Sequence, residues 1–211
     1  MKASPRCPRC HGSIAPPGLF SSEWRCDTHG PVAPLQPPVP PNEDALTAIV
    51  SMTRVPVWVP WPLPVGWLVA GAVTAGDDRT GWVGCAVALS GPAPLGGPAD
   101  LVLVAEEPGV GIGAGLAGLD TADPGPGAAV GAPVTRVSAA SHPTPMWSLP
   151  PVHGHDRAVY VGEAEGCWLW ALCWPSEVSL VLHDSFELVD LRAPGHQLDL
   201  PFGAPSPRLP G

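Results

Sequence analysis

The sequence predicts a mainly β or α+β fold, in which a small N-terminal module precedes an antiparallel β-rich domain with one short helix. Three observations favour this class. Proline and glycine contribute 31 and 25 of the 211 residues, and prolines this frequent cut most helical windows short. A hydrophobic fraction of 45% with nine tryptophans excludes a wholly disordered chain. Because proline cannot donate to a central sheet ladder, the proline-free windows are expected to hold the regular structure.

The first 30 residues carry a pattern of metal ligands. It consists of Cys7, Cys10, Cys26 and His29. Their spacing, C-x2-C-x15-C-x2-H, is typical of zinc sites, because each short turn aims two side chains at one centre and two turns complete a tetrahedron. His11 is the alternative to His29 as fourth ligand. A site closed by four protein ligands has no open position for substrate, so this Zn²⁺ is expected to be structural, in a zinc ribbon.

The positions of the prolines divide the chain into four parts. These are a zinc-ribbon-like module at 1–36, a proline-rich linker and short helix at 37–54, a β-rich body at 55–192 and a flexible proline-rich tail at 193–211. In the second part, Asn42 can cap a helix at about 43–53, where apolar residues recur at helical spacing.

Strands are expected in the apolar, proline-free runs of the body. They are predicted at 67–74, 82–90, 99–107, 158–163, 167–174, 178–183 and 186–191. The turn residues AGDDRTG make the first two a hairpin, and CWLWALCW, which is apolar on both faces, is expected to be a central strand. Residues 56–64 and 121–151 are interpreted as mostly loop, and 109–120 as a loop or a poor strand.

Several motifs in the body do not support a reaction. Residues 113–118 match G-x-G-x-x-G, but no helix is expected after them, as a dinucleotide-binding loop requires. His153, His155 and Asp156 could bind a metal, although solvated loop residues are the favoured reading. Six charged residues are the candidates for an enzymatic or ligand-binding site: Asp77, Asp78, Arg79, Glu106, Glu107 and Asp156.

Charge and cysteine content suggest a cytoplasmic protein with little affinity for nucleic acid. Residues 1–30 carry four basic and two acidic side chains, whereas the remainder carries six basic and 17 acidic ones. An acidic body repels nucleic acid, so only the N-terminal arginines could contact phosphates. No signal peptide is expected, and Cys85, Cys167 and Cys173 lie in apolar runs as reduced thiols. The prolines within 55–76 argue against a transmembrane span there.

The chain resembles, along nearly its whole length, an actinobacterial family of unknown function. The motifs that carry the resemblance are CPRC…CDxHG, PVWVPWPLPVGW (56–67), AGDDRTG (75–81), SGPAPLGGPADLVLVAEEPGVGIG (90–113), DPGP (123–126) and WLWALCWP (168–175). The resemblance implies a cytosolic protein of high-GC Gram-positive bacteria. Some relatives carry a phosphotransacetylase label, which is not transferred because the sequence shows no acyl-phosphate or coenzyme A site.

Three functions are therefore considered. The leading one is a non-enzymatic interaction or regulatory module with a structural zinc site and a protein partner. The first alternative is an enzyme or small-ligand binder with its site in the β-rich body. The second is nucleic-acid contact by the zinc ribbon through Arg6, Arg9 and Arg25.

Overall fold

The computed structural model describes residues 4–19, 21–150, 156–183, 186–193 and 199–210. A small sheet contains β1 (Ile14–Ala15), β2 (Arg25–Cys26) and β3 (Gly30–Pro31). A large sheet contains β4 (Trp58–Pro60), β5 (Leu68–Asp77), β6 (Gly81–Pro92), β7 (Pro98–Glu106), β8 (Thr135–Ala139), β9 (His142–Leu149), β10 (Ala158–Ala164), β11 (Cys167–Trp174) and β12 (Glu187–Asp190). The helices are α1 (Glu43–Met52), α2 (Ile112–Ala117) and the 3₁₀ helix η1 (Ser176–His183). The predicted mainly β class is confirmed.

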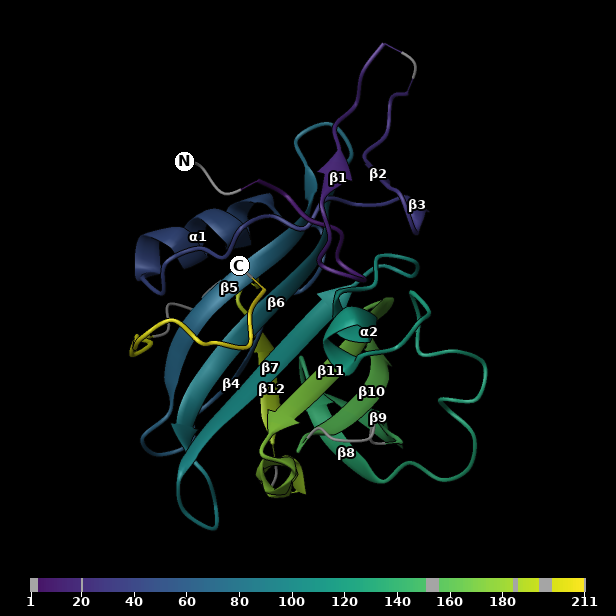
Figure 1. Ribbon diagram of the computed structural model, residues 1–211. Helices are drawn as coiled ribbons and strands as arrows, with labels where there is room; N and C mark the ends of the chain where they lie inside the picture. Colours follow the sequence, from purple (N-terminus) through teal and green to yellow (C-terminus); the bar gives the residue numbers. More distant parts are fainter. Residues whose placement is uncertain (1–3, 20, 151–155, 184–185, 194–198, 211) are drawn as a thin grey trace.

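The large sheet has nine strands in the order β4-β12-β8-β9-β10-β11-β7-β6-β5 (Figure 1). Its strands pair antiparallel, except that β12 runs parallel to β8. The predicted hairpin is present as β5 and β6, which pair from Leu68 opposite Ser90 to Asp77 opposite Gly81. The CWLWALCW segment forms β11, between β10 and β7, so its prediction as a central strand is confirmed.

Apolar side chains fill both faces of this sheet. One face packs against α1 and η1, and its core includes Ile49, Trp58 and Leu182. The opposite face packs against α2, and its core includes Ile112 and Trp170. The helix α1 starts as the sequence predicts, because the side chain of Asn42 accepts a hydrogen bond from the Ala45 amide.

Two strands lie where the sequence predicts mostly loop. The structure corrects residues 121–151 by placing β8 and β9 there, and β9 contains Pro143 and Pro145. These prolines lie two residues apart, so both lack a backbone N–H group on the same side of the strand. Pairing of β9 with β10 begins only at Trp147, opposite Val161. A strand can therefore tolerate both prolines. The predicted 56–64 loop likewise contains the short strand β4, which pairs with β12.

The predicted strand at 178–183 is wrong, because the chain forms the 3₁₀ helix η1 there. Val178 and Leu182 are buried, whereas Leu180, midway between them, is half exposed. Burial four residues apart is a helical period rather than the alternation of a strand. The predicted strand at 186–191 is present as β12.

Segments from both ends of the chain cover the free edge of β5. Toward the C-terminal end of β5, the backbone N–H of Gln36 donates to the Thr74 carbonyl oxygen. In the middle of the strand, the backbone N–H of Val39 donates to the Ala72 carbonyl oxygen. Residues 199–210 belong to the part predicted as a loose tail, and here the Gly203 amide donates to Val69. An uncovered edge strand is a template for aggregation, and these contacts protect it.

Candidate metal centre

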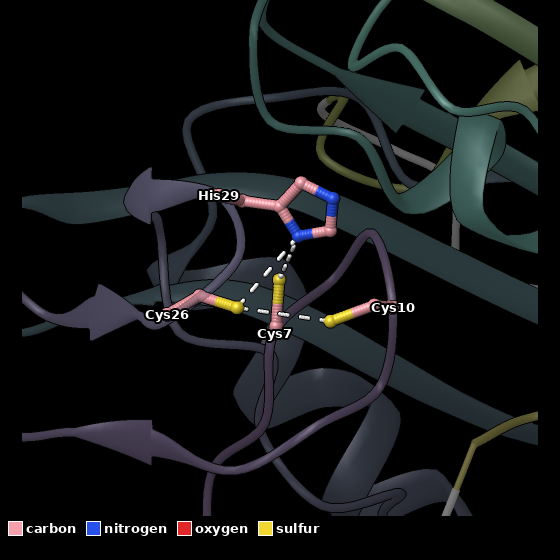
Figure 2. A group of neighbouring side chains, drawn as sticks. All are labelled: Cys7, Cys10, Cys26 and His29. Carbon is pink, nitrogen blue, oxygen red and sulfur yellow. Dashed lines mark hydrogen bonds between the residues drawn. The ribbon is translucent and has the colours of Figure 1, made fainter.

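The structure brings the side chains of Cys7, Cys10, Cys26 and His29 together (Figure 2). Their ligand atoms all lie within 4.8 Å of one another. The Sγ atoms of Cys10 and Cys26 are 3.7 Å apart, and Nδ1 of His29 lies 3.5 Å from Sγ of Cys7 and 3.7 Å from Sγ of Cys26. A tetrahedral zinc site with Zn–S near 2.3 Å and Zn–N near 2.0 Å requires S–S separations of about 3.8 Å and S–N separations of about 3.5 Å. The group therefore fits a tetrahedral metal ion.

Local backbone geometry positions the four side chains in two turns, which we call the first knuckle (7–12) and the second knuckle (26–30). In the first knuckle the Cys7 amide donates to Gly12 and the His11 amide donates to Cys7. The second knuckle is held by the small sheet, where Cys26 pairs with both Ile14 of β1 and Gly30 of β3. Gly30 has φ +70°, which a residue with a side chain rarely adopts.

The two buried thiols differ in how readily they ionise. Burial raises the pKa of Cys7 to about 11, despite hydrogen bonds from the backbone amides of Cys10 and Arg9. Burial also acts on Cys26, but the amides of His29 and Thr28 and the His29 side chain lower its pKa to about 6. A bound metal ion would deprotonate its thiol ligands outright, so the charge at this group is coupled to metal binding.

His11 lies on the first knuckle but is not part of the Cys/His group. Its backbone is in the left-handed region, with φ 55°. Its Nε2 atom is buried and has no hydrogen-bond partner among the residues that the structure describes. Burial, followed by the nearby Arg6 charge, lowers the pKa of its imidazole. The structure thus gathers His29, rather than His11, with the three cysteines.

The first knuckle packs against α2, a helix that the sequence pattern does not predict. A Cβ atom on Gly115 would lie 2.3 Å from the carbonyl oxygen of Pro8 and 2.9 Å from that of Arg9. A Cβ on Gly113 would lie 2.3 Å from the ring of Trp170 on β11. Only glycine allows both approaches. The interpretation of residues 109–120 as a loop or a poor strand is therefore wrong, because α2 lies there. The G-x-G-x-x-G glycines lie within α2 and at its end, where they permit close packing.

Charged side chains cap both ends of α2. The buried carboxylate of Glu106 accepts hydrogen bonds from the amides of Ile112 at 2.5 Å and Gly113 at 3.0 Å. The guanidinium group of Arg157 donates to the carbonyl oxygens of Leu116 and Ala117. An acceptor at the N-terminus and a donor at the C-terminus satisfy backbone groups that have no partner within the helix, and the Arg157 cation also interacts favourably with the helix dipole. A six-residue helix that includes two glycines depends on such contacts.

The second knuckle is attached to the β5–β6 hairpin. The indole Nε1 of Trp24, just before β2, donates a 2.8 Å hydrogen bond to Oδ2 of Asp77. The other carboxylate oxygen of Asp77 accepts from the Arg79 and Thr80 amides and from the Thr80 hydroxyl. The Thr80 hydroxyl is the main group that lowers the pKa of Asp77 to about 2. Asp77 thus closes the hairpin turn and also holds the second knuckle.

The six charged candidates of the body do not converge. Asp77 and Glu106 are engaged as described, and Asp78, Arg79 and Glu107 are exposed. Asp156 accepts hydrogen bonds from the amide and hydroxyl of Ser176. A cavity of about 310 Å³ beside Asp156 is lined by Arg157, Tyr160 and Ser176 among others, and by none of the other five candidates. His153 and His155 lie outside the described residues.

The remaining cysteines lie apart from the knuckles. Cys85, Cys167 and Cys173 are buried and free, and burial raises the pKa of each thiol. They therefore behave as inert core residues, as the sequence predicts. Within the described parts of the chain, no helix combines the length and apolar composition needed to cross a membrane.

Comparison with known proteins places the chain in a family whose function is not known. The chain belongs to the family of unknown function DUF6758, whose model matches residues 1–209. No curated protein and no solved structure matches it.

Proposed function

We propose that this protein binds one structural Zn²⁺ through Cys7, Cys10, Cys26 and His29 and serves as a non-enzymatic interaction or regulatory module in the cytoplasm. The observation that carries the proposal is the packing of three thiols and one imidazole within 4.8 Å of one another. Three sulfur ligands and one nitrogen ligand are a donor set that zinc favours. The actinobacterial origin implied by the sequence motifs agrees with a cytoplasmic protein that keeps its thiols reduced.

The shape of the site supports a structural rather than a catalytic ion. Four protein ligands fill a tetrahedral shell and leave no position for substrate. Cys7 and Cys26 are buried. The small sheet has strands of two residues each and cannot bury a core of its own, so the ion supplies the cross-link that a short segment needs.

A role in protein interaction is supported by the surface of the body. Leu95 and Val65 are 75% and 95% exposed, in loops at the same end of the large sheet, and residues 61–67 and 93–97 contain no charged side chain. Large exposed aliphatic side chains in uncharged loops are suited to contact with another protein. An enzyme is less well supported, because the charged candidates of the body are dispersed. Nucleic-acid contact is also less well supported, because the Arg9 side chain packs against Gly111.

Metal analysis of purified protein tests the zinc proposal. We expect about one zinc per chain, and loss of zinc in His29→Ala, because removal of one ligand opens the tetrahedral shell. His11→Ala is the matched control, since it removes an imidazole from the first knuckle that is not part of the Cys/His group. Metal-replete protein that contains no zinc would contradict the proposal, and so would a His11→Ala variant that loses zinc while His29→Ala keeps it.

A further inference from the structure

The two knuckles rest on two different parts of the body. The first knuckle packs on α2, where Gly115 leaves room for the carbonyl oxygens of Pro8 and Arg9. The second knuckle is tied to the β5–β6 turn by the hydrogen bond from Trp24 to Asp77. Figure 1 shows the N-terminal segment running beside α2 and the β5–β6 turn. A metal ion shared by both knuckles would therefore cross-link α2 to the hairpin.

The contact at Gly115 is tight enough to fix the position of the first knuckle. Real Cβ atoms do not approach other atoms closer than 3.0 Å, yet a Cβ here would lie 2.3 Å from a backbone oxygen. The backbone of the knuckle cannot give way as a flexible side chain would. Gly111, just before α2, is also close to this knuckle, but its Cβ would meet a side-chain atom, Cγ of Arg9 at 2.6 Å, which can move. The first knuckle therefore packs directly against the backbone of α2, at a position where Gly115 has no side chain.

The contact at Asp77 fixes the second knuckle by a charge-assisted hydrogen bond. The carboxylate is held in place by its bonds to the turn amides. It is ionised at neutral pH like any solvent-accessible aspartate, and the hydrogen bond from the Thr80 hydroxyl lowers its pKa further, to about 2. A charged acceptor makes the bond from the Trp24 indole stronger than a neutral pair would. Trp24 precedes Cys26 by two residues, so its position bears directly on the second pair of ligands.

We propose that the body of the protein sets the metal affinity of the Cys/His group, with Gly115 and the Trp24–Asp77 pair as positioning residues for the two knuckles. This inference rests on the proposed zinc site. Because the body holds both knuckles in place before the metal binds, less conformational entropy is lost on binding. Linkage is reciprocal, so the bound metal must stabilise the docking of α2 by the same factor.

Two substitutions test the proposal through the zinc dissociation constant, measured by chelator competition on the full chain. Gly115→Ala and Trp24→Phe should each weaken zinc binding by at least about 5-fold, within the range of coupling between two sites. Alanine is the better helix former, so a weaker zinc affinity in Gly115→Ala cannot come from helix propensity. The matched controls are Gly127→Ala, where nothing lies within 4 Å of the added Cβ, and Trp147→Phe, which removes an indole hydrogen bond to Gly131.

A spectroscopic measurement separates positioning from a general effect on folding. Co²⁺ replaces Zn²⁺ in tetrahedral thiolate sites and gives visible absorption that reports their geometry. The two variants should show a shifted or weakened Co²⁺ band, with far-UV circular dichroism equal to that of the wild type. If Gly115→Ala loses the circular-dichroism signal of the folded protein, the test rests on Trp24→Phe. Trp24 is half-buried, and phenylalanine keeps most of its packing.

Hydrogen exchange on the wild-type protein gives the reciprocal measurement. Removal of zinc should speed exchange of the α2 amides by at least about 5-fold, while α1 serves as an internal reference. Unchanged zinc affinity in both variants, or unchanged α2 exchange on zinc removal, would overturn the proposal. A wild-type protein that binds no zinc at all would instead refute the proposed function.

Discussion

Replacement of Glu106 tests the packing between β7, α2 and the first knuckle. Glu106 is 1% exposed, and its carboxylate accepts hydrogen bonds from two amides at the start of α2. Burial raises its pKa to about 7, although the amides of Ile112, Gly113 and Gly111 favour the ionised form. The substitution Glu106→Gln keeps the shape of the side chain and removes its titration. One amide at the helix start then faces an NH₂ group, which costs about 1–3 kcal/mol.

The sign of the pH dependence follows from the two pKa values of Glu106. The ordinary value for glutamate is 4.5 and the folded value is about 7. Between these values the unfolded chain has released the proton that the folded chain still holds, so the free energy of unfolding falls as pH rises. Each pKa unit corresponds to about 1.4 kcal/mol, so Glu106 removes about 3 kcal/mol of stability across this window. Above pH 7 its contribution is constant.

Urea unfolding of both proteins at saturating zinc, from pH 5 to pH 8, measures the effect. The wild type should be the more stable protein at pH 5, and the stability difference should move by about 3 kcal/mol in favour of Glu106→Gln by pH 8. Titration of the knuckle residues affects both proteins and cancels in the difference. A difference that stays constant over this pH range would refute the assignment of Glu106 as a buried carboxyl that titrates near neutrality.

Two further substitutions test local features of the fold. Asn42→Ala removes the side-chain acceptor for the Ala45 amide and should cost about 1 kcal/mol in the free energy of unfolding, measured by urea titration. Arg157→Met removes the hydrogen bonds to the Leu116 and Ala117 carbonyls and should cost about 1–3 kcal/mol, with faster hydrogen exchange in α2. An Asn42→Ala protein as stable as the wild type, or unchanged α2 exchange in Arg157→Met, would contradict the respective cap.

The features that the sequence predicts correctly depend on neighbouring residues. The Cys/His group could be recognised because each knuckle places two ligands within four residues, so only one long-range approach had to be inferred. The helix α1 is signalled by Asn42, and β11 by its apolar residues on both faces. These signals are local propensities and periodicities, which a single sequence displays directly.

The features that were missed depend on tertiary contacts. The prolines of β9 suggest a loop when the sequence alone is considered. Whether a strand can contain proline depends on which of its sides pairs with another strand, and the sequence does not show this. The helix α2 contains Gly113 and Gly115, which disfavour a helix. It is stabilised by Glu106 at the end of β7 and by Arg157, a residue far away in the sequence that just precedes β10. The segment that forms η1 is apolar enough to suggest a strand, and its helical burial emerges only against the sheet.

X-ray absorption spectroscopy on zinc-loaded protein tests the central claim most directly. The Cys/His group predicts three sulfur ligands at about 2.3 Å and one nitrogen ligand at about 2.0 Å from the metal. The nitrogen contribution should remain in His11→Ala, whereas His29→Ala should not retain the ion. A shell with fewer than three sulfurs, or a nitrogen contribution that is lost in His11→Ala and kept in His29→Ala, would contradict the site described here.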